Sequence, residues 1–245
     1  MLTLLTYRIM LMASTFTTNL RSAGACSLFP FFPMTTPIPK PKNGEKKPKA
    51  GSYHHGDLKE ALVAAALDLV DRKGPKGFSL AQVCRQAGVS VAAPYRHFAD
   101  KEALLAAVAQ SGFLLFQGYL EETVRPYEND PFESLRVLAV KYVEFARQNP
   151  SRFRVMFAAD LQKSRFPELF ATAHNAFVVV LKTIERCGTG RSASETYILA
   201  VSIWAQCHGI AVLAVDGFLR EISMEERINE LIKLTLDRFI EDLAK

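Results

Sequence analysis

Hydrophobic positions recur with helical spacing along most of the chain, beginning near residue 58. The first stripe has residues at i, i+4, i+7 and i+11, namely Leu58, Leu62, Ala65 and Leu69. Asp57 and Glu60 have the spacing of an acidic capping box before it, and the pair Gly74-Pro75 is expected to end the helix. No strand-like alternation and no fixed repeat follows, so the sequence predicts an all-α fold.

Two short helices are expected next. Ser79 and Gln82 form a capping box for a helix from about Leu80 to Ala87, which Gly88 ends as a left-handed C′ residue. Ser90 is expected to cap a second helix after a turn of about three residues. This spacing predicts a helix-turn-helix.

The second of these helices begins with the small residues Val91, Ala92 and Ala93, so its front is slim enough to enter a DNA major groove. Pro94 lies just past its first turn, where the missing N–H is expected to tighten or distort the helix.

A long third helix is predicted from its cap at Asp100 to roughly Glu122, where Arg125-Pro126 closes it. This helix is long enough to connect the N-terminal helix-turn-helix domain, called the head here, to a separate C-terminal domain, called the body. Lys101 in its first turn opposes the helix dipole, so it is either an ordinary surface lysine or a lysine held beside a phosphate.

The body is predicted to contain five helical segments, at about 131–148, 151–159, 167–187, 194–217 and 224–243. The segment 194–217 is apolar nearly all round, which requires burial or lipid. Its interior polar residues, and the lack of a second candidate span, argue against a membrane. Burial between the body and a partner subunit is the better interpretation.

Charge is distributed unevenly. Residues 1–110 hold 14 Lys and Arg against 7 Asp and Glu, a net +7, whereas residues 111–245 hold 16 against 18, a net −2. This asymmetry is expected of a protein whose basic head binds a polyanion. Five lysines between Lys40 and Lys49 account for part of the excess positive charge.

Residues 1–52 differ from the rest, because prolines cluster and no acidic residue precedes Glu45; we expect disorder there. The apolar start from Leu2 to Met12 leaves three alternatives: a secretory signal, a transit peptide, or translation from Met34 that yields a basic arm. The third is preferred, since nothing basic precedes Arg8.

Catalytic and metal-binding motifs are missing from the sequence. The four cysteines have neither zinc-ligand nor disulfide spacing, and we find no nucleophile elbow or phosphate loop. We therefore expect no metal, no cofactor and no enzymatic activity, and a reducing compartment.

The run AGVSVAAPYRHFADKEALL resembles the DNA-binding signature of the TetR family of bacterial transcriptional regulators, and the resemblance covers about residues 53 to 110. It implies binding to double-stranded DNA and a homodimer formed through the last two long helices. In the body, Trp204, His208 and Gly209 resemble the Trp-x-x-x-His-Gly motif of a TetR subgroup.

The expected DNA contacts fall into two groups, contacts with phosphates and contacts with bases. Four residues are expected to hold phosphates: Ser79, Tyr95, His97 and Lys101. Four are expected to face bases, with Arg96 as the reader of guanine: Val91, Ala92, Ala93 and Arg96.

A ligand pocket in the body has six candidate lining residues: Phe153, Met156, Phe157, Phe177, Trp204 and His208. The same residues also fit plain core or interface packing, and both interpretations stay open here.

The sequence thus predicts a basic extension over residues 1–52, a helix-turn-helix domain over 53–100 and a ligand-binding and dimerisation domain over 101–245. We expect a cytoplasmic repressor, without a membrane partner, that a small and mainly apolar ligand releases from a palindromic operator. The alternatives are an architectural DNA-binding protein without sequence preference and a helical enzyme that uses His208.

Overall fold

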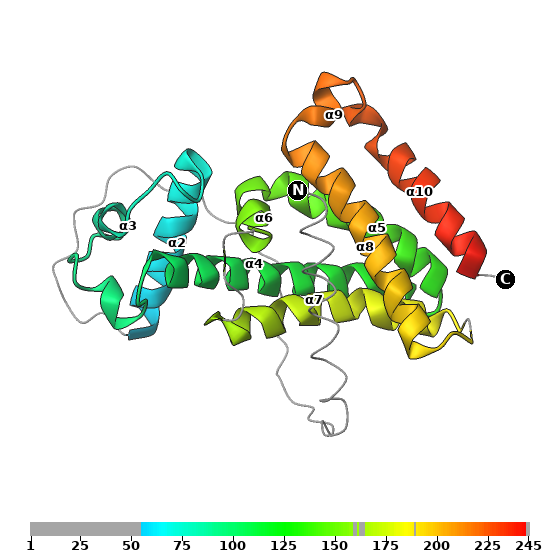
Figure 1. Ribbon diagram of the computed structural model, residues 1–245, viewed down its shortest axis with the longest axis horizontal. Helices are drawn as coiled ribbons and strands as arrows, with labels where there is room; N and C mark the ends of the chain where they lie inside the picture. Colours follow the sequence, from blue (N-terminus) through cyan, green and yellow to red (C-terminus); the bar gives the residue numbers. More distant parts are fainter. Residues whose placement is uncertain (1–54, 159–160, 162–164, 189, 244–245) are drawn as a thin grey trace. The chain divides into compact units, whose positions relative to one another are not determined.

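The computed structural model describes residues 55–158, 161, 165–188 and 190–243. Helices joined by turns and loops make up this part, with no strand among the described residues, which confirms the predicted all-α fold (Figure 1). The expectations for residues 1–52, including the start at Met34, lie outside the described residues.

The first helix, α2 (His55–Lys73), buries the predicted stripe. Leu62, Ala65 and Leu69 are at most 7% exposed, and Gly74 ends the helix with a φ of +74°. The predicted cap is wrong, because the backbone is already helical two residues before Asp57.

The next helix, α3 (Leu80–Ala87), has both ends as predicted. The Ser79 hydroxyl accepts from the Gln82 backbone N–H, and the Gln82 side chain accepts from the Ser79 N–H at 2.9 Å. Gly88 follows at φ +70°, a conformation that glycine adopts without steric cost. Local sequence therefore fixes where this helix starts and stops.

The predicted α-helix after Ser90 is not present. Residues 91 and 92 form a turn, and a single 3₁₀ turn, η1 (Pro94–Arg96), follows. An α-helix would need an N–H at residue 94 to donate to the Ser90 carbonyl, and proline has none. The Ala93 N–H donates to that carbonyl instead, at 3.0 Å, which gives the tighter geometry.

Asp100 caps the long helix α4 (Lys101–Val124) as predicted, by accepting from the Ala103 N–H at 2.8 Å. The 3₁₀ turn η2 (Arg125–Tyr127) closes it. Gly112 lets α6 (Pro150–Met156) approach closely, because a Cβ at Gly112 would lie 2.7 Å from Cγ of the buried Met156.

The rest of the body consists of α5 (Pro131–Gln148), α7 (Pro167–Arg186), α8 (Ala193–Val215), α9 (Phe218–Glu221), η4 (Glu225–Arg227) and α10 (Ile228–Leu243). The helix α7 runs beside α4, and α8 packs against α5 and α10 (Figure 1). The sequence missed α9, and the last long helix begins four residues after the predicted Met224.

Two helical stretches have the length and composition of a membrane span, 101–127 and 193–215. The expectation that no second candidate exists is therefore wrong. Both stretches contribute buried residues to the helical core, among them Leu104 and Ala200, and core helices pass the same test. Length and composition alone therefore do not indicate a membrane.

Candidate functional site

The predicted base-contacting residues lie on one short segment between α3 and α4. Val91 and Tyr95 are each 60% exposed, an unusual exposure for large apolar side chains, and Ala92 and Arg96 are exposed beside them. We name Val91, Ala92, Tyr95 and Arg96 the recognition edge. Ala93 and His97, which complete the predicted set on this segment, are half-buried.

The Lys101 side chain has contacts inside the chain. Its ammonium donates to the Phe78 carbonyl at 2.7 Å and to the Lys76 carbonyl at 3.3 Å, and it lies 4.2 Å from the centre of the Phe78 ring. Desolvation by burial lowers the pKa of this ammonium. With two of three N–H bonds used internally, Lys101 joins the start of α4 to the α2–α3 turn, and its third N–H is available, so a phosphate contact by Lys101 stays a prediction.

Ser79 has a structural role as the cap of α3, and its side chain stays exposed. A hydroxyl that accepts one hydrogen bond still has a proton to donate. A phosphate contact by Ser79 is therefore compatible with its capping role and stays a prediction.

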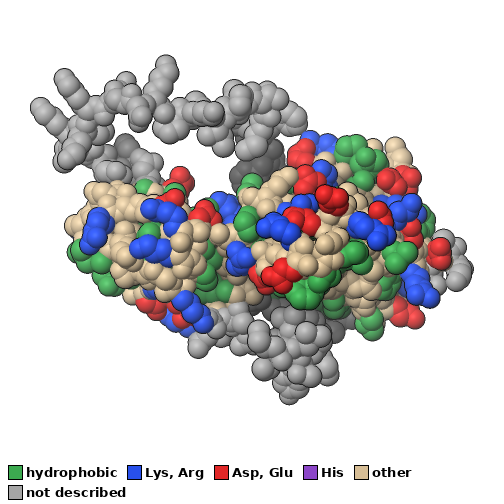
Figure 2. All heavy atoms as spheres, turned by 90° about the horizontal axis from the view of Figure 1, so that it is seen from above, with side chains coloured by type: hydrophobic (Ala, Val, Ile, Leu, Met, Phe, Trp, Pro, Cys, Tyr) green, Lys and Arg blue, Asp and Glu red, His purple; other side chains and the backbone are tan. Residues whose placement is uncertain are grey.

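Most of the net positive charge of residues 1–110 lies in the N-terminal extension and not in the described part of the head, residues 55–110. Residues 55–110 carry seven Lys and Arg against six Asp and Glu, a net +1, whereas residues 1–54 carry seven against one, a net +6. On the face shown in Figure 2, acidic and basic side chains are mixed over the described part. The basic half predicted from the sequence is thus mostly the N-terminal extension.

Five of the six predicted pocket residues come together in the body. With Tyr142 they form what we call the aromatic cluster: Tyr142, Phe153, Phe157, Phe177, Trp204 and His208. Ring centroids lie 4.5 Å apart for Phe157 and His208, 5.8 Å for Trp204 and His208, and 6.1 Å for Phe177 and Trp204. The sixth residue, Met156, packs against Gly112 instead.

Tyr142 is the residue that sequence reasoning missed. Its hydroxyl accepts from the Trp204 indole N–H at 3.0 Å and lies 2.9 Å from Nδ1 of His208. Burial raises the pKa of the Tyr142 hydroxyl well above its ordinary value. The available signal was a tyrosine in the apolar stripe of α5, since a buried hydroxyl usually requires a partner.

We expect Tyr142→Phe to lower the free energy of unfolding by about 1–3 kcal/mol, because it removes the hydrogen-bond partner of Trp204 and of His208 Nδ1. Urea denaturation measures the change. Tyr95→Phe, at an exposed hydroxyl, serves as the control and should alter stability by no more than about 0.5 kcal/mol. Equal stability of the two variants would contradict a network centred on Tyr142.

The solvent-facing side of α8 is uncharged and mostly apolar, and its one polar side chain between Ile198 and Ala205 is Ser202, whose hydroxyl donates to the Ile198 carbonyl at 2.8 Å. Ile198 is 62% exposed and Leu213 40%, and Ala205 and Gly209 lie between them on the same face. A Cβ at Gly209 would meet no atom within 4 Å. Nothing inside the described chain therefore requires a glycine at this position. We name Ile198, Ala205, Gly209 and Leu213 the α8 stripe.

Among the described residues, no group of three or more His, Cys, Asp or Glu side chains is arranged to hold a metal ion. Cys207 is deeply buried, which raises the pKa of its thiol to about 12 and leaves it protonated and unreactive at neutral pH.

Comparisons with known proteins agree with this geometry. Residues 62–108 match the family described as bacterial regulatory proteins, tetR family, and residues 135–239 match the tetracyclin repressor-like C-terminal domain. The nucleoid occlusion factor SlmA of Serratia proteamaculans is 30% identical over 162 residues, which are 62% of this chain and 79% of that protein.

Solved structures are similar over nearly their whole length. A protein of unknown function from Rhodococcus sp. RHA1 superposes with a TM-score of 0.65 at 31% identity, over 79% of this chain and 98% of that one. The TetR family regulator PfmR from Thermus thermophilus shares the fold, with a TM-score of 0.56 at 18% identity over 74% of this chain and 97% of PfmR. The chain therefore belongs to the TetR family of DNA-binding transcriptional regulators, which is not a family of enzymes.

Proposed function

We propose that this protein is a dimeric repressor in the cytoplasm that binds a palindromic operator and leaves it when a small ligand binds the body. The observation that carries the proposal is the recognition edge, where two large apolar side chains and an arginine are exposed on a segment that the capped helix α3 holds in place. We retain residues 53–100 as the DNA-binding domain and 101–245 as the ligand-binding and dimerisation domain.

The proposed contacts with DNA are of two kinds, contacts with bases and contacts with phosphates. Arg96 can donate two hydrogen bonds to the O6 and N7 atoms of a guanine, and Val91 and Ala92 offer apolar contact to thymine methyl groups. Ser79, Tyr95 and His97 would position the protein on phosphates, as would Lys101 through its third N–H. Ala93 is half-buried, so it contributes less to base contact than the sequence suggested.

Dimerisation is proposed through the α8 stripe, and the 78% exposed Leu234 of α10 is a further apolar side chain that a partner subunit could cover. Small residues let two helix backbones approach closely, and the aliphatic ends of the stripe would be covered by the second copy. A two-fold dimer presents its recognition edges to successive major grooves about 34–36 Å apart, which requires an operator with palindromic half-sites.

The aromatic cluster is the proposed ligand-sensing part of the body. Its rings contact one another, so a mainly apolar ligand would have to separate them while its polar group replaces a hydrogen bond of Tyr142 or His208. A ligand that prefers the released conformation by about 10⁴-fold, roughly 5.5 kcal/mol, would nearly invert the equilibrium between bound and released dimers.

The test of DNA binding is fluorescence anisotropy with the DNA upstream of the gene and with a scrambled duplex, at two salt concentrations. We expect a preference of about 10³-fold or more for the upstream DNA that survives the higher salt. Equal affinities that both collapse with salt would mean either that the operator lies elsewhere or that the protein binds DNA generally, as an architectural protein does. Selection of bound fragments from the whole genome would separate these two outcomes.

Two substitutions on the recognition edge separate base contact from phosphate contact. We expect Arg96→Ala to cost about 1–3 kcal/mol on the operator and to relax specificity at one base pair. Tyr95→Phe should weaken binding to all sequences alike, by about 0.5–1.5 kcal/mol. The measurement is anisotropy on a set of operator duplexes with single base changes, and a uniform loss from Arg96→Ala would contradict its assignment.

A second candidate comes from the relatives named nucleoid occlusion factors. Under this alternative, the protein would act on the chromosome at many sites and not control neighbouring genes. Mapping bound sites across the genome, with transcripts measured with and without the protein, distinguishes the two. Bound sites whose neighbouring transcripts stay constant would favour the second candidate.

A further inference from the structure

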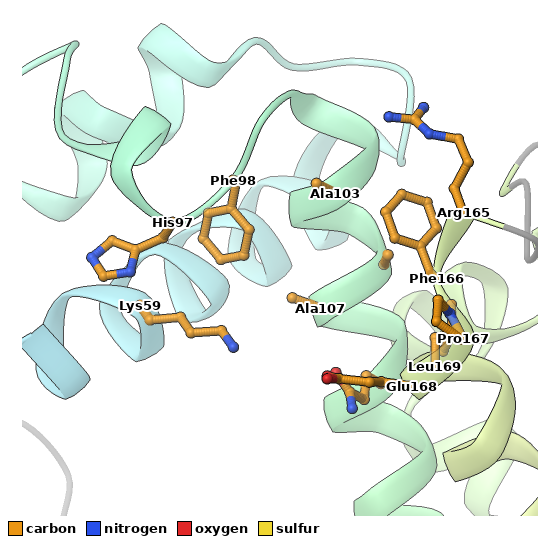
Figure 3. Close-up of a pocket in the computed structure, with 12 residues that line it drawn as sticks. Lys59, His97, Phe98, Ala103, Ala107, Arg165, Phe166, Pro167, Glu168 and Leu169 are labelled. Atoms are coloured by element: carbon orange, nitrogen blue, oxygen red, sulfur yellow. The ribbon is translucent and has the colours of Figure 1, made fainter.

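A cavity of about 250 Å³ lies where α2 and the segment after η1 meet α4 and the first turn of α7 (Figure 3). It is separate from the aromatic cluster, with which it shares no residue. Its apolar lining residues are Phe98, Ala103, Ala107, Phe166 and Leu169. Ala103, Ala107 and Phe166 are half-buried and offer the accessible apolar surface, whereas Phe98 and Leu169 are each only 3% exposed and lie behind it.

Two opposite charges line this cavity on different helices. Lys59 extends its ammonium from α2 toward α4, and Glu168 lies on the other side of the cavity at the start of α7, with Ala107 between them (Figure 3). Neither side chain forms an ion pair with another described residue. Both residues are exposed, so within the described part of the chain the solvent-accessible rim of the cavity has a cation and an anion on opposite sides, neither in an ion pair.

The other charged residue of the wall is already engaged. The Arg165 guanidinium is paired with Asp100 at 2.8 Å and also with Glu102, both at the start of α4. The hydrogen bond from Arg165, followed by the one from the Ala103 N–H, holds the pKa of the Asp100 carboxyl below its ordinary value. Arg165 is therefore already paired, and its cluster with the two carboxylates has a net charge of −1, so Lys59 and Glu168 are the cavity's charged side chains without an ion pair.

Size and polarity together define a ligand class. At about 30 Å³ per water, the cavity has room for about eight waters, or for an organic molecule of roughly ten non-hydrogen atoms. We propose that it binds a small zwitterion with an apolar side chain, of the class of the apolar L-amino acids. The carboxylate would pair with Lys59, the ammonium with Glu168, and the side chain would contact Ala107 and Phe166.

Such a ligand would connect the head to the body. Lys59 and Phe98 belong to the part of the chain that carries the recognition edge, whereas Glu168 and Phe166 belong to the start of α7. Occupancy would favour one orientation of the head, and linkage requires that operator DNA and the ligand change each other's affinity by the same factor. This regulatory consequence rests on the proposed function, but binding of the zwitterion does not.

The first experiment is isothermal titration of the full chain, without DNA, with L-valine, L-leucine, L-isoleucine, L-methionine and L-phenylalanine. We expect saturable binding of at least one, with a Kd below about 1 mM. Two analogues of leucine test the charges: 4-methylpentanoate lacks the ammonium and 3-methylbutylamine lacks the carboxylate. Each should bind at least about tenfold more weakly than leucine, if leucine is the amino acid that binds. For another amino acid, the matching pair of analogues is used. No saturation by any of the five would overturn the proposal.

Matched variants locate the site. Lys59→Gln and Glu168→Gln should each weaken binding at least about tenfold, whereas Lys73→Gln on α2 and Glu185→Gln on α7 should leave it unchanged. Ala107→Met should block binding by filling the cavity, and thermal unfolding checks that every variant is folded. Loss of binding in the control variants, or none in Lys59→Gln and Glu168→Gln, would also overturn the proposal. Because the titration contains no DNA, failure here leaves the DNA-binding proposal untouched.

Discussion

Replacing Gly209 by glutamate is expected to convert the protein into a monomer and to lower its operator affinity by at least about a thousandfold, toward non-specific binding. The carboxylate would stand in the middle of the α8 stripe, where a second copy would bury it without a cation. Sedimentation velocity measures the oligomeric state, and fluorescence anisotropy measures the affinity for the operator.

A second glycine provides the control. Gly118 on α4 also has no atom within 4 Å of a Cβ placed on it, so Gly118→Glu adds the same charge to another helix without an internal clash. It should leave the dimer intact. Gly209→Ala is informative as well, because alanine favours a helix by about 1 kcal/mol over glycine and should stabilise an isolated chain. A weaker dimer despite that gain would indicate close approach of two α8 helices, and a dimeric Gly209→Glu would refute the proposed interface.

Neutralising the lysines of the N-terminal extension is expected to have the second largest effect on the affinity for DNA. Replacing Lys40, Lys42, Lys46, Lys47 and Lys49 by glutamine should lower affinity for every DNA sequence by about a hundredfold or more at low salt. The reason is that residues 55–110 carry a net charge of only +1, so the extension supplies most of the positive charge available for phosphates.

The salt dependence of binding measures this effect directly. If all five lysines contact phosphates, the slope of log affinity against log salt should become shallower by up to about 4.5, at about 0.9 per contact. Lys182→Gln, on α7 of the body, should leave the slope unchanged. Preference among operator variants should survive the five substitutions, because the recognition edge is intact. An unchanged slope would mean that the extension does not contact DNA.

Local signals in the sequence predicted local structure well. The capping box at Ser79 and Gln82, the stop at Gly88 and the cap at Asp100 all act within four residues, and each is present in the structure. One local signal was overlooked: Ser192 and Glu195 form a second capping box, which starts α8 one residue before the predicted Ser194.

The region after Ser90 shows where two local signals conflict. The small residues that follow a capping serine favour a helix, whereas Pro94 removes the N–H that an α-helix needs at that position. Pro94 has the stronger effect, because helix-favouring neighbours cannot supply the backbone N–H that proline lacks. Arg96 therefore stands on a single 3₁₀ turn, and the exposed recognition edge is shorter than the sequence suggested.

The sequence by itself determined the helical class, the ends of most helices and the family, because these depend on residues close together in the chain. Only the tertiary structure decided which side chains meet. Tyr142 lies 66 residues from His208, Lys101 reaches back 23 residues to the Phe78 carbonyl, and the facing charges of Lys59 and Glu168 come from separate helices. Such pairings depend on how helices pack, and no short-range pattern specifies packing.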